Sequence, residues 1–127
     1  MKITELNLQP NIEKALTEMG YVDLTSIQEM TLSPLLDGFD VIGEAPTGTG
    51  KTAAYCVPML EKIVPASGKV QALVICPTRE LAIQVIQEIS KFAKYIPSIR
   101  YVAIYGGQKI STQLRELKSN IICRLSA

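Results

Sequence analysis

The chain contains no histidine and no tryptophan, and aromatic residues make up only 6% of its 127 positions. Histidine is the side chain that most often transfers protons near neutral pH, and it is the commonest metal ligand in proteins. Its absence excludes histidine-based acid–base catalysis and most zinc catalysis.

Cysteine is also scarce, and its distribution argues against cross-links. Cys56, Cys76 and Cys123 are odd in number, widely spaced and placed within apolar runs. Disulfide frameworks and zinc sites need paired or clustered cysteines. We therefore expect buried, reduced thiols, as in a cytoplasmic protein.

Long apolar runs are missing as well. No stretch reaches the roughly 18 apolar residues that cross a bilayer, so no membrane association is expected. Residues 1–5 do not lead into the apolar segment of a secretory signal, so none is expected here.

Charge is distributed unequally along the chain. Residues 1–50 carry two lysines against eight acidic residues, a net charge of −6, whereas residues 51–127 carry eleven basic residues against four glutamates, a net charge of +7. The basic part suits a polyanion such as nucleic acid. A solvated face that pairs with the acidic part explains the charge nearly as well.

The clearest feature that is present is a phosphate-binding pattern. The segment 45–52 reads A-P-T-G-T-G-K-T, follows the short apolar run 40–43 and precedes good helix formers. A strand, a tight glycine loop and a helix in this order form a P-loop, in which backbone N–H groups converge on phosphate oxygens. Lys51 is expected to reach the β- and γ-phosphates of a nucleotide, and the Thr52 hydroxyl to bind Mg²⁺. The residues expected to bind a nucleoside triphosphate are Ala45, Pro46, Thr47, Gly48, Thr49, Gly50, Lys51 and Thr52.

Helical and extended patterns alternate along the rest of the chain. Periodicity and capping residues predict helices at 10–19, 26–36, 51–64, 80–95 and 110–117. Apolar and β-branched runs predict strands at 40–44, 70–76, 100–105 and 121–123, the second of them covered on both faces. In the helix 80–95, the residues expected in the core are Leu81, Val85, Ile89, Phe92 and Ile96. Such alternation is typical of one α/β domain with a parallel sheet flanked by helices.

Three further segments accompany the P-loop. Tyr21 follows a glycine and lies seven residues before Gln28, within G-Y-V-D-L-T-S-I-Q. Residues 77–82 spell P-T-R-E-L-A just after a predicted strand, and the pair 106–107 is Gly-Gly after another. In this order and spacing, the segments resemble the N-terminal RecA-like domain of DEAD-box ATP-dependent RNA helicases, over nearly the whole chain. The resemblance implies a RecA-like P-loop NTPase fold.

The resemblance also implies roles for individual residues. Gln28 is similar to the glutamine that reads the adenine edge, and Tyr21 to the aromatic that stacks on the adenine ring. The residues similar to those that grip the sugar-phosphate backbone of RNA are Pro77, Thr78, Arg79, Gly106 and Gly107. Residues 1–40 would then serve adenine recognition, and residues 41–127 the nucleotide phosphates and RNA. Backbone contacts carry no base information, so we expect RNA binding that is independent of sequence. The cofactors that the resemblance implies are ATP or ADP and Mg²⁺.

Structural alternatives exist for these residues. Tyr21 could simply pack in the core, and Gln28 could be an uncommitted surface amide. Thr78 and Arg79 could serve only as a helix cap and as an ion-pair partner of the neighbouring Glu80.

The chain departs from the family pattern at three places. The adenine segment of the family usually reads P-T-P-I-Q, whereas Leu24 and Ser26 stand here in place of the prolines, which predicts a less rigid loop. Ile3 replaces an upstream aromatic, which removes ring stacking but keeps apolar support. Pro46 replaces the usual glutamine of the P-loop.

The T-P-G-R and D-E-A-D segments of the family do not occur in the sequence. Residues 121–123 are followed by R-L-S-A, and every aspartate precedes the P-loop. A Mg²⁺-binding carboxylate and a water-orienting carboxylate belong at strand ends, whereas the later glutamates lie in predicted helices. We therefore expect a partial domain that binds nucleotide and RNA, lacks hydrolysis and unwinding by itself, and leaves apolar sheet edges exposed. A second RecA-like domain is expected in the full-length protein.

Two other functions remain open. A catalytically inactive module that sequesters nucleotide or RNA would carry the same motifs. An unrelated P-loop kinase or NTPase would share only the segment 45–52, and P-T-R-E-L-A argues against it.

Overall fold

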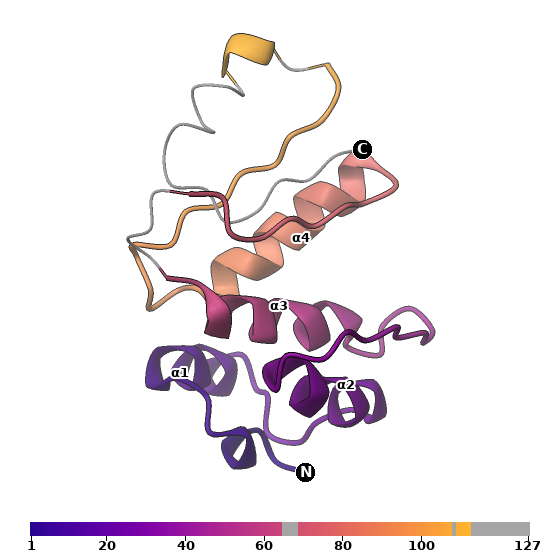
Figure 1. Ribbon diagram of the computed structural model, residues 1–127, viewed down its shortest axis with the longest axis vertical. Coiled ribbons are helices and arrows are strands. Elements are labelled where there is room, and N and C mark those ends of the chain that lie inside the picture. The colour runs from indigo at the N-terminus through magenta and orange to yellow at the C-terminus, as the bar shows by residue number, and fades with distance from the viewer. Residues whose placement is uncertain (65–68, 108, 113–127) are drawn as a thin grey trace. The chain divides into compact units, whose positions relative to one another are not determined.

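The computed structural model describes residues 1–64, 69–107 and 109–112 (Figure 1). Its named helical elements are the 3-10 helix η1 (Ile3–Leu6), α1 (Pro10–Glu18), α2 (Ser26–Leu36), α3 (Lys51–Lys62) and α4 (Arg79–Phe92). Residues 110–112 are helical as well, and the remainder of the helix predicted there lies outside the described residues. The chain divides into a first unit, residues 1–62 with 91–95, and a second unit, residues 63–90 with the chain from 96 onward.

The first unit begins with α1, whose two ends follow the predicted signals. Pro10 occupies the first turn, where its missing N–H has no helical partner to lose. At the other end, Gly20 has φ +87°, and Tyr21 N–H donates to the Leu16 carbonyl over 3.0 Å. A left-handed glycine with this bond closes a helix without leaving its last carbonyls unpaired. Ile12 and Leu16 on the inner face are fully buried.

Helix α2 is bounded by a reciprocal cap and a glycine. Thr25 Oγ1 accepts from Gln28 N–H, while Gln28 Oε1 accepts from Thr25 N–H, so two otherwise unpaired donors of the first turn are satisfied. At the end, Gly38 has φ +93° and Phe39 N–H donates to the Pro34 carbonyl. The predicted bounds of this helix are confirmed.

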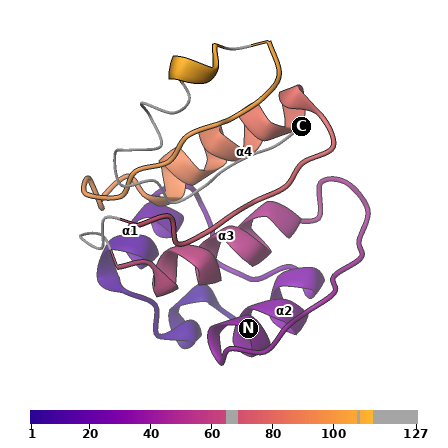
Figure 2. The same cartoon turned by 45° about the horizontal axis from the view of Figure 1, so that its top comes forward.

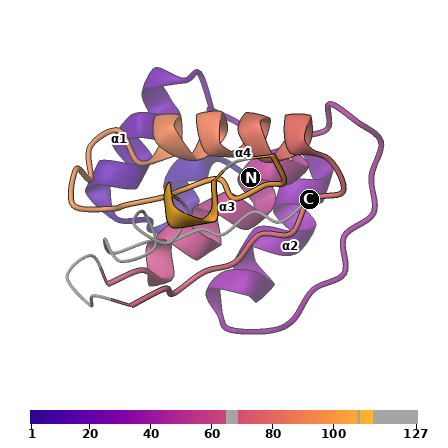
Figure 3. The same ribbon diagram turned by 90° about the horizontal axis from the view of Figure 1, so that it is seen from above.

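Helix α3 packs against α2 and also contacts α1 (Figures 1 and 2). Its inner face is small and apolar, and it is made of Ala53, Ala54, Cys56, Val57, Pro58 and Leu60. Gln9 fastens the start of α1 to the end of α3, because its backbone N–H donates to Glu61 Oε1 over 2.6 Å and its side-chain amide donates to the Glu61 carbonyl over 3.0 Å. Between α2 and α3 the chain makes a wide arc, residues 37–50, that contains no helix (Figure 3).

The predicted strands are not formed in the described part of the chain. The segments 40–44, 70–76 and 100–105 run without helix or strand, and 121–123 lies outside the described residues. Apolar and β-branched residues favour extended backbone, but a strand exists only when its N–H and C=O groups pair with a neighbouring strand. Within the described residues, the one isolated β-bridge joins Lys2 to Asp23.

Coverage of the segment 70–76 also differs from the prediction. Leu73 and Ile75 are 55% and 73% exposed, whereas Cys76 is buried. Side chains of successive residues in extended backbone point to opposite sides, so one side of this segment is covered and the other is open. The prediction of exposed apolar sheet edges stays a prediction, because the described residues form no sheet.

Helix α4, whose residues 79–90 belong to the second unit, starts at a threonine cap. Thr78 Oγ1 accepts from Leu81 N–H over 3.2 Å, as the sequence predicted. The buried residues of α4 in this unit are Ala82, Val85 and Ile89, and Phe92 at the helix end is buried in the first unit. Leu81 was expected in the buried face of the helix but is 39% exposed, because a shift of one residue turns a side chain by about 100° around a helix.

Two further predictions concern thiols and membrane spans. Cys56 and Cys76 are buried and are not in a disulfide, as expected, and burial raises the pKa of the Cys76 thiol. Cys123 lies outside the described residues. In the part of the chain that the structure describes, no helix is both long enough and apolar enough to cross a membrane.

Candidate functional site

Residues 45–52, here called the glycine loop, form a turn that is closed by its own side chains. The turn falls at Thr47 and Gly48, and α3 begins at Lys51. Thr49 Oγ1 donates to the Pro46 carbonyl over 2.7 Å. The Lys51 ammonium donates to the Ala45 carbonyl, so the last part of the loop folds back to the first. The positive charge of Lys51 is thereby held at the loop while its side chain stays exposed.

Two glycines of the loop adopt backbone conformations that other residues rarely take. Gly48 has φ +83° and Gly50 has φ +91°. A Cβ on Gly48 would meet nothing within 4 Å, whereas a Cβ on Gly50 would lie 2.3 Å from Gln28 Nε2. Gly50 is therefore required both by its φ angle and by the side chain beside it.

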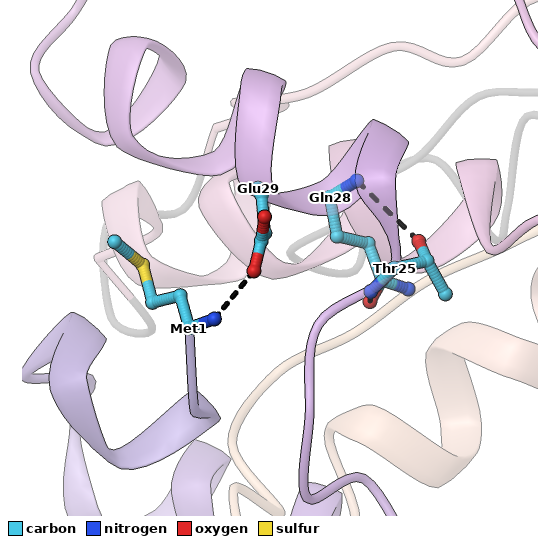
Figure 4. Close-up of polar contacts among 4 residues, drawn as sticks. All are labelled: Met1, Thr25, Gln28 and Glu29. Atoms are coloured by element: carbon cyan, nitrogen blue, oxygen red, sulfur yellow. Dashed lines mark hydrogen bonds and ion pairs between the residues drawn. The ribbon is translucent and has the colours of Figure 1, made fainter.

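Gln28 links the start of α2 to the glycine loop. Its side chain is almost completely buried, with 2% of the residue exposed. Gln28 Oε1 accepts from Thr25 N–H over 3.0 Å, and Gln28 Nε2 donates to the Gly50 carbonyl over 3.2 Å. Figure 4 shows Gln28 beside Thr25 at the helix start, together with the separate ion pair between the Met1 amine and Glu29. The alternative of an uncommitted surface amide is wrong, and adenine reading by Gln28 stays a prediction.

Tyr21 has a packing partner in the same unit. Its ring meets the Phe92 ring edge to face, with the centroids 6.1 Å apart and the planes at 69°. This geometry is the favourable arrangement of two aromatic quadrupoles. Tyr21 is only partly buried, so packing does not cover the whole side chain, and stacking on adenine stays a prediction.

The segment between Tyr21 and Thr25 is held by the first residues of the chain. Ile3 N–H donates to the Val22 carbonyl, and Leu24 N–H donates to the Met1 carbonyl, each over 3.0 Å. The side chains of Ile3 and Leu24 are both buried. Two residues that depart from the family pattern therefore serve as apolar and backbone anchors of this segment.

The glycine loop offers Mg²⁺ a hydroxyl and no carboxylate. Thr52, the second residue of α3, is partly exposed. Among the described residues, no group of three or more histidine, cysteine, aspartate or glutamate side chains could hold a metal ion. Mg²⁺ keeps several waters and is commonly bound through nucleotide phosphates, so the loop fits an ion that arrives with a nucleotide.

The second unit brings the other predicted residues together through an aromatic contact. The guanidinium carbon of Arg79 lies 4.6 Å from the centroid of the Tyr105 ring. Tyr105 directly precedes Gly106 and Gly107, so this contact joins the P-T-R segment to the glycine pair. The arginine–tyrosine cluster, as it is called below, consists of Pro77, Thr78, Arg79, Tyr105, Gly106 and Gly107.

The cluster presents donors at an exposed helix start. Pro77, Thr78 and Arg79 are exposed, and no ion pair joins Arg79 to Glu80 in the described structure. Thr78 caps α4 through one lone pair and keeps its O–H donor. Guanidinium donors at a helix N-terminus attract anionic oxygens. Among the described residues the ion-pair alternative for Arg79 thus has no supporting contact, whereas the Thr78 cap is present.

The glycine pair leaves open space in the cluster. Gly107 has φ +89°, which favours glycine, and a Cβ on Gly106 would meet no atom within 4 Å among the residues that the structure describes. A ligand backbone can therefore approach Gly106 closely. The sequence patterns did not predict Tyr105 as a site residue. Its position directly before the glycine pair is the signal that could have indicated it.

Comparison with known proteins gives consistent results. A family model described as DEAD/DEAH box helicase matches residues 25–125. The chain is 50% identical over 119 residues to the ATP-dependent RNA helicase CshA of Listeria monocytogenes, which covers 94% of the chain and 23% of that protein. It is 49% identical over 121 residues to the DEAD-box ATP-dependent RNA helicase CshA of Bacillus subtilis, which covers 91% of the chain and 23% of that protein. The chain thus spans about a quarter of the length of the curated relatives it matches.

A solved structure supports the fold. The chain is similar to the crystal structure of a DEAD box protein from the hyperthermophile Methanococcus jannaschii, with a TM-score of 0.92 and 34% identity. The match covers 100% of this chain and 34% of that one. This likeness confirms the predicted α/β, RecA-like fold class, even though the described residues form no strand.

Proposed function

Because the chain belongs to the DEAD/DEAH box helicase family, we propose that it is part of the first RecA-like domain of an ATP-dependent RNA helicase. The glycine loop would bind the phosphates of ATP or ADP, and the arginine–tyrosine cluster would bind the backbone of RNA. Residues 1–40 would contribute adenine recognition and residues 41–127 the phosphate and RNA contacts. The observation that carries the proposal is the hydrogen bond from Gln28 to Gly50, because it links the residue proposed to read adenine to the loop proposed to bind phosphate.

The hydrogen-bonding capacity of Gln28 supports adenine recognition. A glutamine amide has two N–H donors and two acceptor lone pairs, and Gln28 uses one of each on Gly50 and Thr25. One donor and one acceptor remain, which matches N7 and the N6 amino group of adenine. Since the residue is 2% exposed, adenine has to uncover this edge of the amide when it binds. The two bonds already made hold the amide in one orientation for that contact.

Lys51 supports phosphate binding. Its ammonium donates to the neutral Ala45 carbonyl, and charge-assisted bonds to phosphate oxygens are stronger than bonds to neutral acceptors. Lys51 therefore gains by moving from Ala45 to a phosphate. Mg²⁺, when present, neutralises phosphate charge, and Thr52 would be its ligand from the protein.

Hydrolysis and strand separation are proposed for the longer protein. The chain holds no aspartate after the glycine loop, so the 127-residue polypeptide lacks the carboxylate pair that binds Mg²⁺ and orients water in phosphoryl transfer. The D-E-A-D segment in the rest of the first domain would supply these carboxylates, and a second RecA-like domain would supply an arginine finger and close the nucleotide cleft. A cytoplasmic location is part of the proposal, because Cys56 and Cys76 are not in a disulfide.

The proposal is tested by changing the charge at one end of α3 and then at the other. We expect Lys51→Ala to weaken binding of a fluorescent ATP analogue about tenfold or more, because a hydrogen bond to a charged group is worth roughly 1.5–3 kcal/mol. Lys62→Ala removes an exposed lysine from the last turn of α3 and serves as the matched control. Titration followed by fluorescence anisotropy measures both variants.

Poly-U retention on filters and phosphate release complete the test. Wild-type chain should bind poly-U less tightly as salt rises, since phosphate contacts release counterions. The chain by itself should release no phosphate above background. Equal ATP affinity of Lys51→Ala and wild type would contradict the nucleotide site, and transfer of phosphate to a small acceptor without poly-U binding would favour a kinase instead.

A further inference from the structure

Tyr105 is the partner that the structure gives to Arg79. Its ring centroid lies 4.6 Å from the guanidinium carbon, within the range in which a cation is attracted by an aromatic ring. Arg79 is exposed at the first position of α4, and a free arginine side chain there would sample many rotamers. Contact with the partly buried ring of Tyr105 restricts that sampling.

The contact keeps the arginine available for another ligand. A cation–π interaction engages the π face of the aromatic ring, whereas phosphate recognition uses the N–H donors of the guanidinium group. Arg79 carries five such donors, and no ion pair to Glu80 competes for them in the described structure. The contact with Tyr105 therefore orders the Arg79 side chain and leaves its N–H donors available for hydrogen bonds to a ligand.

The position of Tyr105 in the chain adds a second consequence. The residue lies immediately before Gly106, where an added Cβ would meet no atom of the described residues within 4 Å. Because Tyr105 adjoins this glycine pair, its contact with Arg79 holds the guanidinium near backbone that a ligand can approach closely. An ordered donor next to an open backbone suits a continuous run of phosphates better than a single small anion.

We propose that Tyr105 is a positioning residue for RNA: it holds the Arg79 guanidinium beside the Gly106–Gly107 turn, so that both grip the same stretch of backbone. The inference rests on the proposed RNA-binding function and adds a residue to it. Tyr105 acts through Arg79 and not by contact with a base. A platform on which a base stacks would instead contribute to binding independently of the arginine.

A double-mutant cycle on the full 127-residue chain tests this role. Poly-U affinity is measured at several salt concentrations for wild type, Tyr105→Leu, Tyr105→Phe, Arg79→Met and the Arg79→Met/Tyr105→Leu pair. We expect Tyr105→Leu to lose about two- to fivefold in affinity, the size of an exposed cation–π interaction, and Tyr105→Phe to retain wild-type affinity. Arg79→Met should lower the salt slope by about 0.7, the value for one single-strand phosphate contact. The pair should bind no more weakly than Arg79→Met alone.

A structural measurement without RNA accompanies the cycle. The side-chain protons of Arg79 should show an upfield ring-current shift in the NMR spectrum of wild type and Tyr105→Phe. The shift should be absent in Tyr105→Leu, and its absence in wild type would overturn the proposal even if the leucine variant failed to fold. ATP-analogue affinity should be the same in all variants, because the glycine loop is untouched.

The other outcomes distinguish the proposed RNA binding from the proposed positioning role of Tyr105. Loss of poly-U binding by Arg79→Met but not by Tyr105→Leu would overturn the positioning role and leave RNA binding standing. Losses that multiply in the pair would show that Tyr105 contacts RNA by itself, and an equal loss in Tyr105→Phe and Tyr105→Leu would assign the effect to the hydroxyl. Failure of wild type to bind poly-U would overturn RNA binding and the positioning role together.

Discussion

The glycine loop and the arginine–tyrosine cluster both direct donors at places where anionic oxygens fit, but they are held in different ways. Gly50 of the loop is fixed by a bond from Gln28, a side chain that is almost completely buried and bonded at both ends of its amide. Arg79 of the cluster is held by the face of one partly exposed ring. A buried polar network is costly to disturb, because each broken bond leaves an unsatisfied group, whereas an exposed contact is replaced by water. The loop is therefore expected to be sensitive to single changes and the cluster to be tolerant of them.

The largest effect on stability is expected from Gly50→Ala, and the same substitution at Gly106 in the other site is its control. Gly50→Ala places a methyl group 2.3 Å from Gln28 Nε2 at φ +91°, so both backbone strain and displacement of Gln28 are expected. Strain of this kind costs roughly 1–3 kcal/mol in the free energy of unfolding, and ATP affinity should fall with it. Urea denaturation measures the stability.

Gly106→Ala is the control, because its methyl group enters open space. Its stability should stay near that of wild type while poly-U affinity falls, since only the approach of a ligand is obstructed. Equal destabilisation by the two alanines would remove the contrast between the sites.

An intermediate effect is expected from the two threonine caps. Thr25→Ala and Thr78→Ala each remove a side-chain acceptor from the start of a helix, which costs about 1 kcal/mol. The functional effects should differ, because Thr25 lies beside Gln28 and Thr78 beside Arg79. We expect weaker ATP binding from the first variant and weaker poly-U binding from the second, measured by the same two titrations.

Thr17→Ala is the matched control for both caps. Thr17 Oγ1 bonds to the Glu13 carbonyl within α1, so its removal costs no capping interaction. If Thr25→Ala altered poly-U affinity as much as ATP affinity, the two sites would not be independent.

The smallest effect is expected from an exposed contact in the first unit. The Tyr95 hydroxyl and the Lys94 ammonium both donate to the Glu18 carboxylate, and these bonds lower the pKa of Glu18 below its ordinary value. A depressed carboxyl pKa stabilises the folded state above the unfolded value of 4.5 and loses that contribution as the pH falls through the folded pKa. Glu18→Gln should therefore flatten the dependence of the urea midpoint on pH below about 4.5.

Tyr95→Phe isolates the first of these bonds. It removes the hydroxyl donor but keeps the ring, which the Lys14 ammonium approaches to 4.3 Å. The flattening should be partial in this variant and more complete in Glu18→Gln. A pH dependence unchanged in both variants would show that the contact contributes nothing to stability.

Sequence patterns predicted those features that depend on neighbouring residues. The starts and ends of α1 and α2 follow from Pro10, Gly20, Thr25 and Gly38, because caps and left-handed glycines act within a few residues. The prediction of a strand at 70–76 was wrong, because a strand depends on residues that are distant in the sequence. Its apolar residues describe a preference for extended backbone, while ladder pairing and coverage depend on what lies beside the segment.

In the candidate site, too, the sequence predicted local features and did not predict contacts between distant residues. The A-P-T-G-T-G-K-T segment predicts a loop in which glycines turn and a lysine follows, and the structure has this loop at the start of α3. The sequence did not indicate that Gln28 would be buried with both ends of its amide occupied. It also did not pair Arg79 with Tyr105, because nothing local relates residues so far apart.

The sequence alone therefore determined the family resemblance, the helix limits and the position of the glycine loop, since each rests on short-range spacing and backbone preference. Only the tertiary structure decided which side chains meet: Gln28 with Gly50, Tyr21 with Phe92 and Arg79 with Tyr105. Burial and contact between distant residues depend on how the chain packs. These contacts are what turn separate sequence motifs into two candidate binding sites.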